Sequence, residues 1–206
     1  MVMGKTLIVP RVGGFSDLPS FAKGAVDTVC WPADFPYKPE VRFAIAHDGR
    51  ALLIRFDVEE ENPKAVTTQN NGPVWEDSCV EFFVKEPDSP YYFNFETNCI
   101  GAGLAAKRLS RSEFKHFSPA EMACVVRRPS LPAEPLDIQA RTAWFLELEI
   151  PFALICGDGA CPSRLLANFY KCGDKTAVPH YLSWNPVEVP SPDFHRPEFF
   201  GELIIA

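Results

Sequence analysis

The chain has 206 residues, of which 47% are hydrophobic and 23% charged. This balance is typical of a globular protein and excludes a disordered chain, collagen and a coiled coil. The net charge is −7, which argues against a nucleic-acid or anionic-membrane partner, because binding phosphates needs a concentrated basic surface. The length and the absence of a linker predict one domain spanning residues 1–206.

The cysteines and the opening segment indicate the cellular context. Seven cysteines are too few for a disulfide-dense scaffold, so we interpret most of them as small buried hydrophobic residues in a reducing compartment. Residues 1–10, MVMGKTLIVP, lack the apolar core of a signal peptide, and no stretch approaches the length of a membrane span. We therefore expect a soluble, cytoplasmic monomer, while export of a longer precursor stays open.

Alternation of apolar and polar residues is the main structural signal. It predicts a hairpin of residues 41–47 and 52–58 around the turn at Asp48-Gly49. Helix is limited to a turn or two at 110–117 and 151–156. Further strands are predicted at residues 78–84, 91–98, 122–127, 143–150, 165–170 and 202–205.

The overall pattern favours one fold class. Twenty prolines exclude long helices, and many short strands with one apolar face each need a second layer to cover that face. We therefore predict an all-β fold, a β-sandwich of mostly antiparallel strands with little helix.

The first candidate site surrounds Trp75, which follows a Gly-Pro turn and precedes a predicted strand. Trp75, Asp77 and Glu81 have the same parity, so an aromatic plate and two carboxylates can project to one side. A sugar ring offers a C–H face for stacking and hydroxyls for carboxylates, which this combination would bind. The alternative is a partly buried tryptophan at the rim and a solvated glutamate.

Two further segments extend this candidate site. In residues 91–98, the polar side chains of Asn94, Glu96 and Asn98 share a face, which lines a concave surface or simply faces solvent. Trp184 lies in a proline-bounded loop, where an indole is available for a ligand or folds back onto the core.

The remaining aromatic and histidine residues suggest structural roles. Trp144 alternates with apolar residues and is predicted to lie in the core, and Trp31 is interpreted as a packing anchor. His180 and His195 have no clear nucleophile partner, so we expect both to make hydrogen bonds in loops.

The sequence lacks the nucleophile elbow, the phosphate-binding loops and the zinc-protease motif. Glycoside hydrolysis needs two carboxylates, which Asp77, Glu81 and Glu96 could supply, so an endo-xylanase-like glycoside hydrolase stays the alternative. Haem binding is a weaker alternative, because Met122 is the only methionine outside the extreme N-terminus.

The segments VWEDSCVEFFV, YYFNFETNCIG, ANFYKCGD, PHYLSWNP and FHRPEFFG together resemble the family-9-like carbohydrate-binding modules found beside xylanases and in Bacteroides-type proteins. The resemblance extends from about residue 25 to residue 206. It implies a β-sandwich that binds oligosaccharide or polysaccharide without catalysis, with structural calcium and no other cofactor.

The resemblance also implies roles for particular residues. A terminal sugar of a xylan- or cellulose-type glycan, preferably its reducing end, would be clamped between Trp75 and Trp184. The carboxylate six residues after the first tryptophan is Glu81. For the arginine that binds sugar hydroxyls the candidates are Arg55 and Arg108, and the calcium ligands cannot be assigned.

Overall fold

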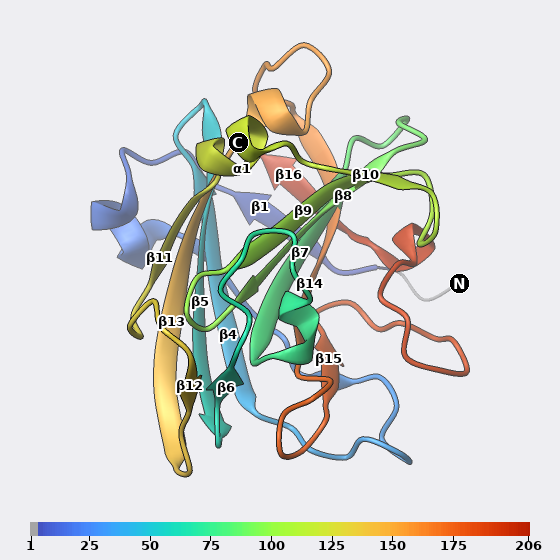
Figure 1. The fold of residues 1–206 in the computed structure, drawn as a ribbon. Coiled ribbons are helices and arrows are strands. Elements are labelled where there is room, and N and C mark those ends of the chain that lie inside the picture. Colours follow the sequence, from blue (N-terminus) through green and yellow to red (C-terminus); the bar gives the residue numbers. More distant parts are fainter. Residues whose placement is uncertain (1–3) are drawn as a thin grey trace.

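The computed structural model describes residues 4–206, so the first three residues of the predicted domain and of the opening segment lie outside the described residues. Two sheets face each other across a shared core (Figure 1). The predicted all-β sandwich is confirmed. Among the described residues, no helix is long and apolar enough to cross a membrane.

The larger sheet has nine strands, with the path β1-β16-β14-β7-β8-β9-β10 and with β15 joining β14 to β3. All its pairings are antiparallel except that of β1 with β16. Its strands are β1 (Thr6–Val9), β3 (Thr28–Val29), β7 (Cys79–Lys85), β8 (Tyr92–Asn98), β9 (Gly103–Arg108), β10 (Phe114–His116), β14 (Arg164–Cys172), β15 (Tyr181–Ser183) and β16 (Gly201–Ile205).

The smaller sheet has five antiparallel strands in the order β11-β13-β5-β4-β2. Its strands are β2 (Ala22–Ala25), β4 (Glu40–His47), β5 (Ala51–Glu61), β11 (Val126–Pro129) and β13 (Arg141–Pro151). A separate two-stranded ribbon pairs β6 (Lys64–Ala65) with β12 (Leu136–Asp137).

Helical structure is short. The elements are the single-turn or two-turn helices η1 (Phe15–Ser20), η2 (Val74–Glu76), η3 (Phe152–Leu154) and η4 (Pro197–Phe199), and the α-helix α1 (Pro119–Cys124). α1 begins with a capping box, in which the Ser118 hydroxyl accepts from the Glu121 backbone N–H and the Glu121 side chain accepts from Ser118. The predicted turn within 151–156 is confirmed by η3.

Two local predictions are wrong. Residues 110–117, expected to be helical, contain the strand β10, which extends the hairpin from β9. Residues 122–127, expected to be a strand, begin inside α1 and become a strand only at Val126. The capping signature S-x-x-E at Ser118 and Glu121 marks the helix start that hydrophobic alternation misses.

The core between the sheets is aromatic at its centre. Phe43 of β4 stacks on Phe169 of β14 with ring centroids 3.7 Å apart, so the two sheets meet through this pair. The Trp184 indole packs edge-on against both rings. Trp144 is also buried here, as predicted, whereas Trp31 is buried in a second cluster on the outer side of the larger sheet.

The outer face of the larger sheet carries the polar residues of interest. On β7 and β8, Phe82 and Phe95 point into the core between the sheets. The alternate residues, Glu81 and Glu96 among them, therefore point to the opposite face, where loops from four parts of the chain surround them.

Candidate sugar-binding pocket

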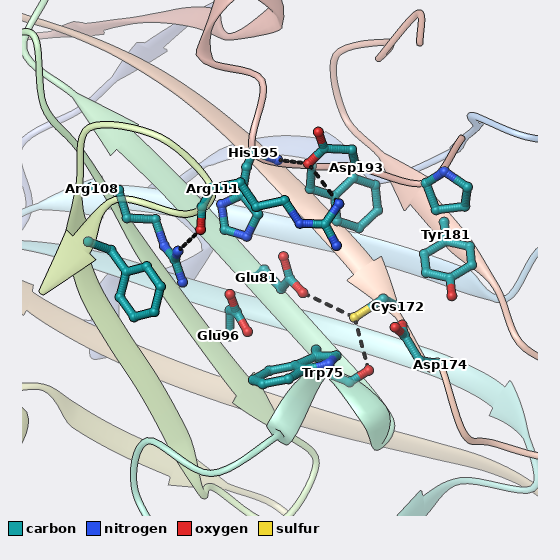
Figure 2. Close-up of a pocket in the computed structure, with 13 residues that line it drawn as sticks. Trp75, Glu81, Glu96, Arg108, Arg111, Cys172, Asp174, Tyr181, Asp193 and His195 are labelled. Carbon is teal, nitrogen blue, oxygen red and sulfur yellow. Dashed lines mark hydrogen bonds and ion pairs between the residues drawn. The ribbon is translucent and has the colours of Figure 1, made fainter. Parts of the chain in front are cut away.

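A cavity of about 340 Å³ lies on the outer face of the larger sheet (Figure 2). This volume is within the range of roughly 300–1,000 Å³ that is usual for small-molecule sites. Its lining consists of Trp75, Glu81, Glu96, Arg108, Arg111, Phe114, Cys172, Asp174, Tyr181, Pro192, Asp193, Phe194 and His195.

Glu81 and Glu96 form the floor of the pocket. They are directly opposite each other on the antiparallel pair β7 and β8, so their carboxyl groups project side by side into the cavity (Figure 2). Both residues are almost completely buried. One oxygen of each, Oε2, is buried without a hydrogen-bond partner among the described residues.

The two floor carboxyls share an unusual electrostatic environment. Burial, together with the neighbouring Glu96 carboxyl, raises the pKa of Glu81 well above its usual range. Burial raises the pKa of Glu96 to about 7, although the hydrogen bond from Asn94 and the charge of Arg108 act in the opposite direction. Both shifts favour the protonated form, and a protonated carboxyl can donate to a ligand hydroxyl as well as accept from one.

Arg108 closes one side of this floor. Its Nε donates to Asn94 Oδ1 at 2.6 Å, and its Nη1 donates to the Arg111 carbonyl at 2.9 Å. Asn94 in turn donates to Glu96 Oε1 at 2.8 Å, so the amide fixes both the arginine and the glutamate. The guanidinium also lies over the Phe114 ring, 4.3 Å from its centroid.

Trp75 forms the exposed aromatic edge of the pocket. It belongs to η2, which is anchored by the fully buried Val74. The Trp75 carbonyl accepts from the Asp174 backbone N–H at 3.2 Å, and the Cys172 sulfur lies 3.5 Å from the same oxygen. Trp75 is 37% exposed and lines the cavity, so its side chain is accessible to a ligand.

The remaining walls come from the chain segments around residues 173–181 and 192–195. Burial raises the pKa of Asp174 to about 6 and lowers the pKa of His195 to about 3. His195 Nδ1 and the Tyr92 hydroxyl share a hydrogen bond of 3.1 Å. Arg111, in the turn after β9, forms an ion pair with Asp193, in which Nη1 lies 3.7 Å from Oδ1.

The structure brings only some of the predicted site residues together. Trp75, Glu81 and Glu96 line the pocket, and Asn94 lies behind it as a bridge between Arg108 and Glu96. Of the two arginine candidates, Arg108 lines the pocket. Arg55 instead lies on the smaller sheet, where it pairs with Asp57 and Glu147.

Asp77 and Asn98 are structural. The Asp77 carboxylate accepts from the backbone N–H groups of Val66 and Thr67 and from Asn98 Nδ2. Asn98 Oδ1 accepts from the Ala102 backbone N–H, which fixes the turn after β8. Neither residue lines the pocket, because these bonds use their polar atoms to hold neighbouring loops.

The expectation for Trp184 as the second half of a clamp needs correction. Its indole is only 4% exposed and packs against Phe43 and Phe169 between the sheets, on the opposite side of the larger sheet from the pocket. The loop context suggested an available indole, but the adjoining strand β15 directs this side chain inward. Among residues 4–206, Trp75 is the only tryptophan that lines the pocket.

Other pocket residues were not singled out from the sequence. Four of them lie in loops or in short strands, where neither parity nor spacing indicates a shared site: Arg111, Phe114, Tyr181 and Asp193. Cys172 and Asp174 have the same parity at the end of β14, a signal that could have placed them on one face.

One cluster of possible metal ligands is found among residues 4–206, formed by Cys79, Glu81 and Cys172. Two thiols and one carboxylate do not match the all-oxygen donor set that Ca²⁺ prefers. The calcium implied by the family resemblance therefore stays a prediction to which no residues are assigned.

Comparison with known proteins places this geometry in a family. Across 98% of this chain, the structure matches all of a candidate carbohydrate-binding protein from Bacteroides uniformis, with 38% identity and a TM-score of 0.92. No curated protein matches.

More distant matches share the fold. A family 9 carbohydrate-binding module from Caldicellulosiruptor kristjanssonii in complex with cellotriose has a TM-score of 0.63 at 10% identity, covering 98% of this chain and 93% of the module. The same kind of module in complex with glucose gives a TM-score of 0.60 at 10% identity, covering 98% and 96%. The model of Carbohydrate-binding family 9 matches residues 16–205. The chain is therefore a member of carbohydrate-binding family 9.

Proposed function

We propose that the pocket binds the terminal sugar of a glucan- or xylan-type glycan without catalysing its cleavage. The observation that carries this proposal is the pair of buried, unpartnered Oε2 atoms of Glu81 and Glu96 beside the exposed face of Trp75. Sugar hydroxyls would satisfy both oxygens while the C–H face of the ring stacks on the indole.

The shape of the pocket favours a chain end over an internal segment. Its floor is enclosed by η2, by the turn after β9 and by the segments around residues 173–181 and 192–195. A site enclosed in this way accepts one end of a polymer, whereas an internal segment needs a groove that is open at both ends. The related modules in complex with cellotriose and glucose support a glucose-type ligand.

The expected strength is modest. Stacking on one indole contributes about 1 kcal/mol beyond area burial, and the exposed lip lets water compete for the ligand hydroxyls. Binding in the micromolar range, about −8 kcal/mol, is therefore expected rather than nanomolar binding.

Tryptophan fluorescence offers a direct test. Trp31, Trp144 and Trp184 are each buried, so acrylamide should quench chiefly Trp75. Cellotriose, xylotriose and glucose should protect Trp75 from quenching in a saturable way, and borohydride-reduced alditols should not if the reducing end is recognised. Trp75→Ala should abolish calorimetric binding with an unchanged Tm. Tyr91→Ala is a matched control, because Tyr91 is equally exposed but lies outside the pocket.

The same samples test the alternative that the protein is a glycoside hydrolase. Asp77 is committed to structural hydrogen bonds, so of the three carboxylates predicted from the sequence Glu81 and Glu96 remain as a catalytic pair. If the protein releases new reducing ends from xylan or cellulose, and Glu96→Gln abolishes that release, then its function is hydrolysis rather than binding. Failure of all three native sugars to bind the folded protein would refute the proposed binding.

A further inference from the structure

Two thiols and a carboxylate meet at one edge of the pocket floor. The sulfur atoms of Cys79 and Cys172 and a carboxylate oxygen of Glu81 all lie within 4.8 Å of one another, and all three residues are buried. Within this cluster, the Cys172 thiol donates a hydrogen bond to Glu81 Oε1 at 3.0 Å (Figure 2).

The sheet itself fixes this arrangement. Cys79 and Cys172 are directly opposite each other on the antiparallel strands β7 and β14, which places their Cβ atoms about 4.5–5.5 Å apart on the same face. Glu81 follows Cys79 by two residues on β7 and therefore points to that same face. The positions of these three groups are set by strand register rather than by a loop, so the groups are held in place before any ligand binds.

The three groups are poorly satisfied by the protein alone. Glu81 Oε2 is buried with no partner among the described residues, and Glu81 Oε1 accepts only from the weakly donating Cys172 thiol. The Cys79 thiol has the Val80 carbonyl at 3.6 Å as its acceptor. A bound cation would deprotonate its coordinating thiols and supply their countercharge.

We propose that Cys79, Cys172 and Glu81 bind one Zn²⁺ ion at the edge of the pocket floor. Two thiolates favour a thiophilic ion over Ca²⁺ or Mg²⁺, and zinc accepts sulfur and carboxylate oxygen together in a tetrahedral set. The fourth position faces the cavity, because Cys172 and Glu81 both line it. Zinc would use Glu81 Oε1, the oxygen beside the Cys172 sulfur, which leaves the Oε2 atoms of Glu81 and Glu96 to the hydroxyls of a sugar. The zinc site goes beyond the proposed sugar binding and does not require it.

Metal binding is measured on the full chain under a thiol-free reductant. The exposed cysteines Cys124 and Cys161 are first replaced by alanine to remove adventitious surface thiols. After incubation with Zn²⁺ and dialysis, elemental analysis should find one zinc per chain. Co²⁺ used as a probe should show the intense near-ultraviolet absorption of thiolate-to-cobalt charge transfer.

Matched variants distinguish the loss of a zinc ligand from a general effect of a substitution on the pocket floor. Cys172→Ala and Glu81→Gln should weaken Zn²⁺ binding by about 100-fold or more, which exceeds the 10–100-fold loss typical of residues that only support a ligand. Glu96→Gln is the control, because it makes the same chemical change at the residue directly opposite Glu81, which is not one of the three proposed ligands. Circular dichroism and Tm confirm that each variant is folded.

Several outcomes would overturn the zinc site. These are no retained zinc, a Co²⁺ spectrum without charge transfer, or equal losses in Glu81→Gln and Glu96→Gln. None of these measurements includes a sugar, so a failed zinc site and a failed sugar site are distinguishable.

Discussion

The ammonium group of Lys171 lies 3.0 Å from Glu60 Oε2 in the interior, and neither side chain is accessible to solvent. Lys171 belongs to β14 and Glu60 to β5, so this ion pair ties the two sheets together. Lys171 Nζ also donates to His180 Nε2 at 2.8 Å, and Trp144 Nε1 donates to Glu60 Oε1 at 2.8 Å. Every member of this network therefore has a partner, which is the condition for a buried charge pair to be tolerated.

Breaking this pair from one side should be costly. Lys171→Met leaves Glu60 as an uncompensated buried charge, so the free energy of unfolding measured in urea should fall by about 3–5 kcal/mol. Lys175→Met removes an exposed pair with Glu76 and should cost less than about 1 kcal/mol. Equal losses in the free energy of unfolding for the two substitutions would show that the buried ion pair stabilises the fold no more than the exposed one.

Gly201 should not tolerate a side chain. A Cβ at this position would lie 2.6 Å from the Lys5 carbonyl oxygen and 2.6 Å from the Trp184 ring, because β16 passes close to both. Gly201→Ala should therefore lower the free energy of unfolding by about 1–3 kcal/mol through overpacking. Gly157→Ala is the control, since a Cβ there meets nothing within 4 Å. An unchanged Tm for Gly201→Ala would contradict the close approach of these segments.

His195 should make stability fall on acidification. Its folded-state pKa of about 3 lies below the usual value of about 6.5, so its contribution is complete above pH 6.5 and is lost as the pH falls toward 3. Between about pH 7.5 and about pH 5, the wild type should lose about 1–2 kcal/mol more than His195→Asn. Urea titrations of both proteins at the two pH values give this difference, and parallel losses would refute it.

Arg108 should position the pocket floor. Arg108→Lys keeps the charge but cannot reproduce the two donors that reach Asn94 Oδ1 and the Arg111 carbonyl. We expect sugar affinity to fall about 10-fold, equivalent to about 1.4 kcal/mol, when measured by calorimetry. Arg55→Lys is the control, because Arg55 lies on the other sheet. Unchanged affinity in Arg108→Lys would remove Arg108 from the site.

The sequence predicts the central strands well because their hydrophobic alternation is strong. The strands β4, β5, β7 and β8 follow from period two and from the turns between them, whereas the register that places Glu81 opposite Glu96 comes only from the structure. Short strands such as β10 carry too few residues for that signal, and their pairing depends on the neighbouring strand.

The two site tryptophans show where sequence reasoning ends. Trp75 follows a turn and Trp184 lies in a proline-bounded loop, and for each the sequence left both ligand stacking and packing open. Their environments differ because η2 stands on the outer face of the larger sheet, whereas Trp184 turns inward against Phe169. That difference is decided by long-range packing, which a local pattern does not contain.

The floor of the pocket and the core of the sandwich are built on the same strands. On β14, Phe169 and Lys171 support the interior, while Cys172 reaches the pocket from the opposite face. The pocket walls, by contrast, come largely from loops. Redesign of ligand preference, by evolution or in the laboratory, should therefore proceed by loop changes around residues 111, 174 and 193. Substitutions in the floor would also disturb the core, because the same strands form both.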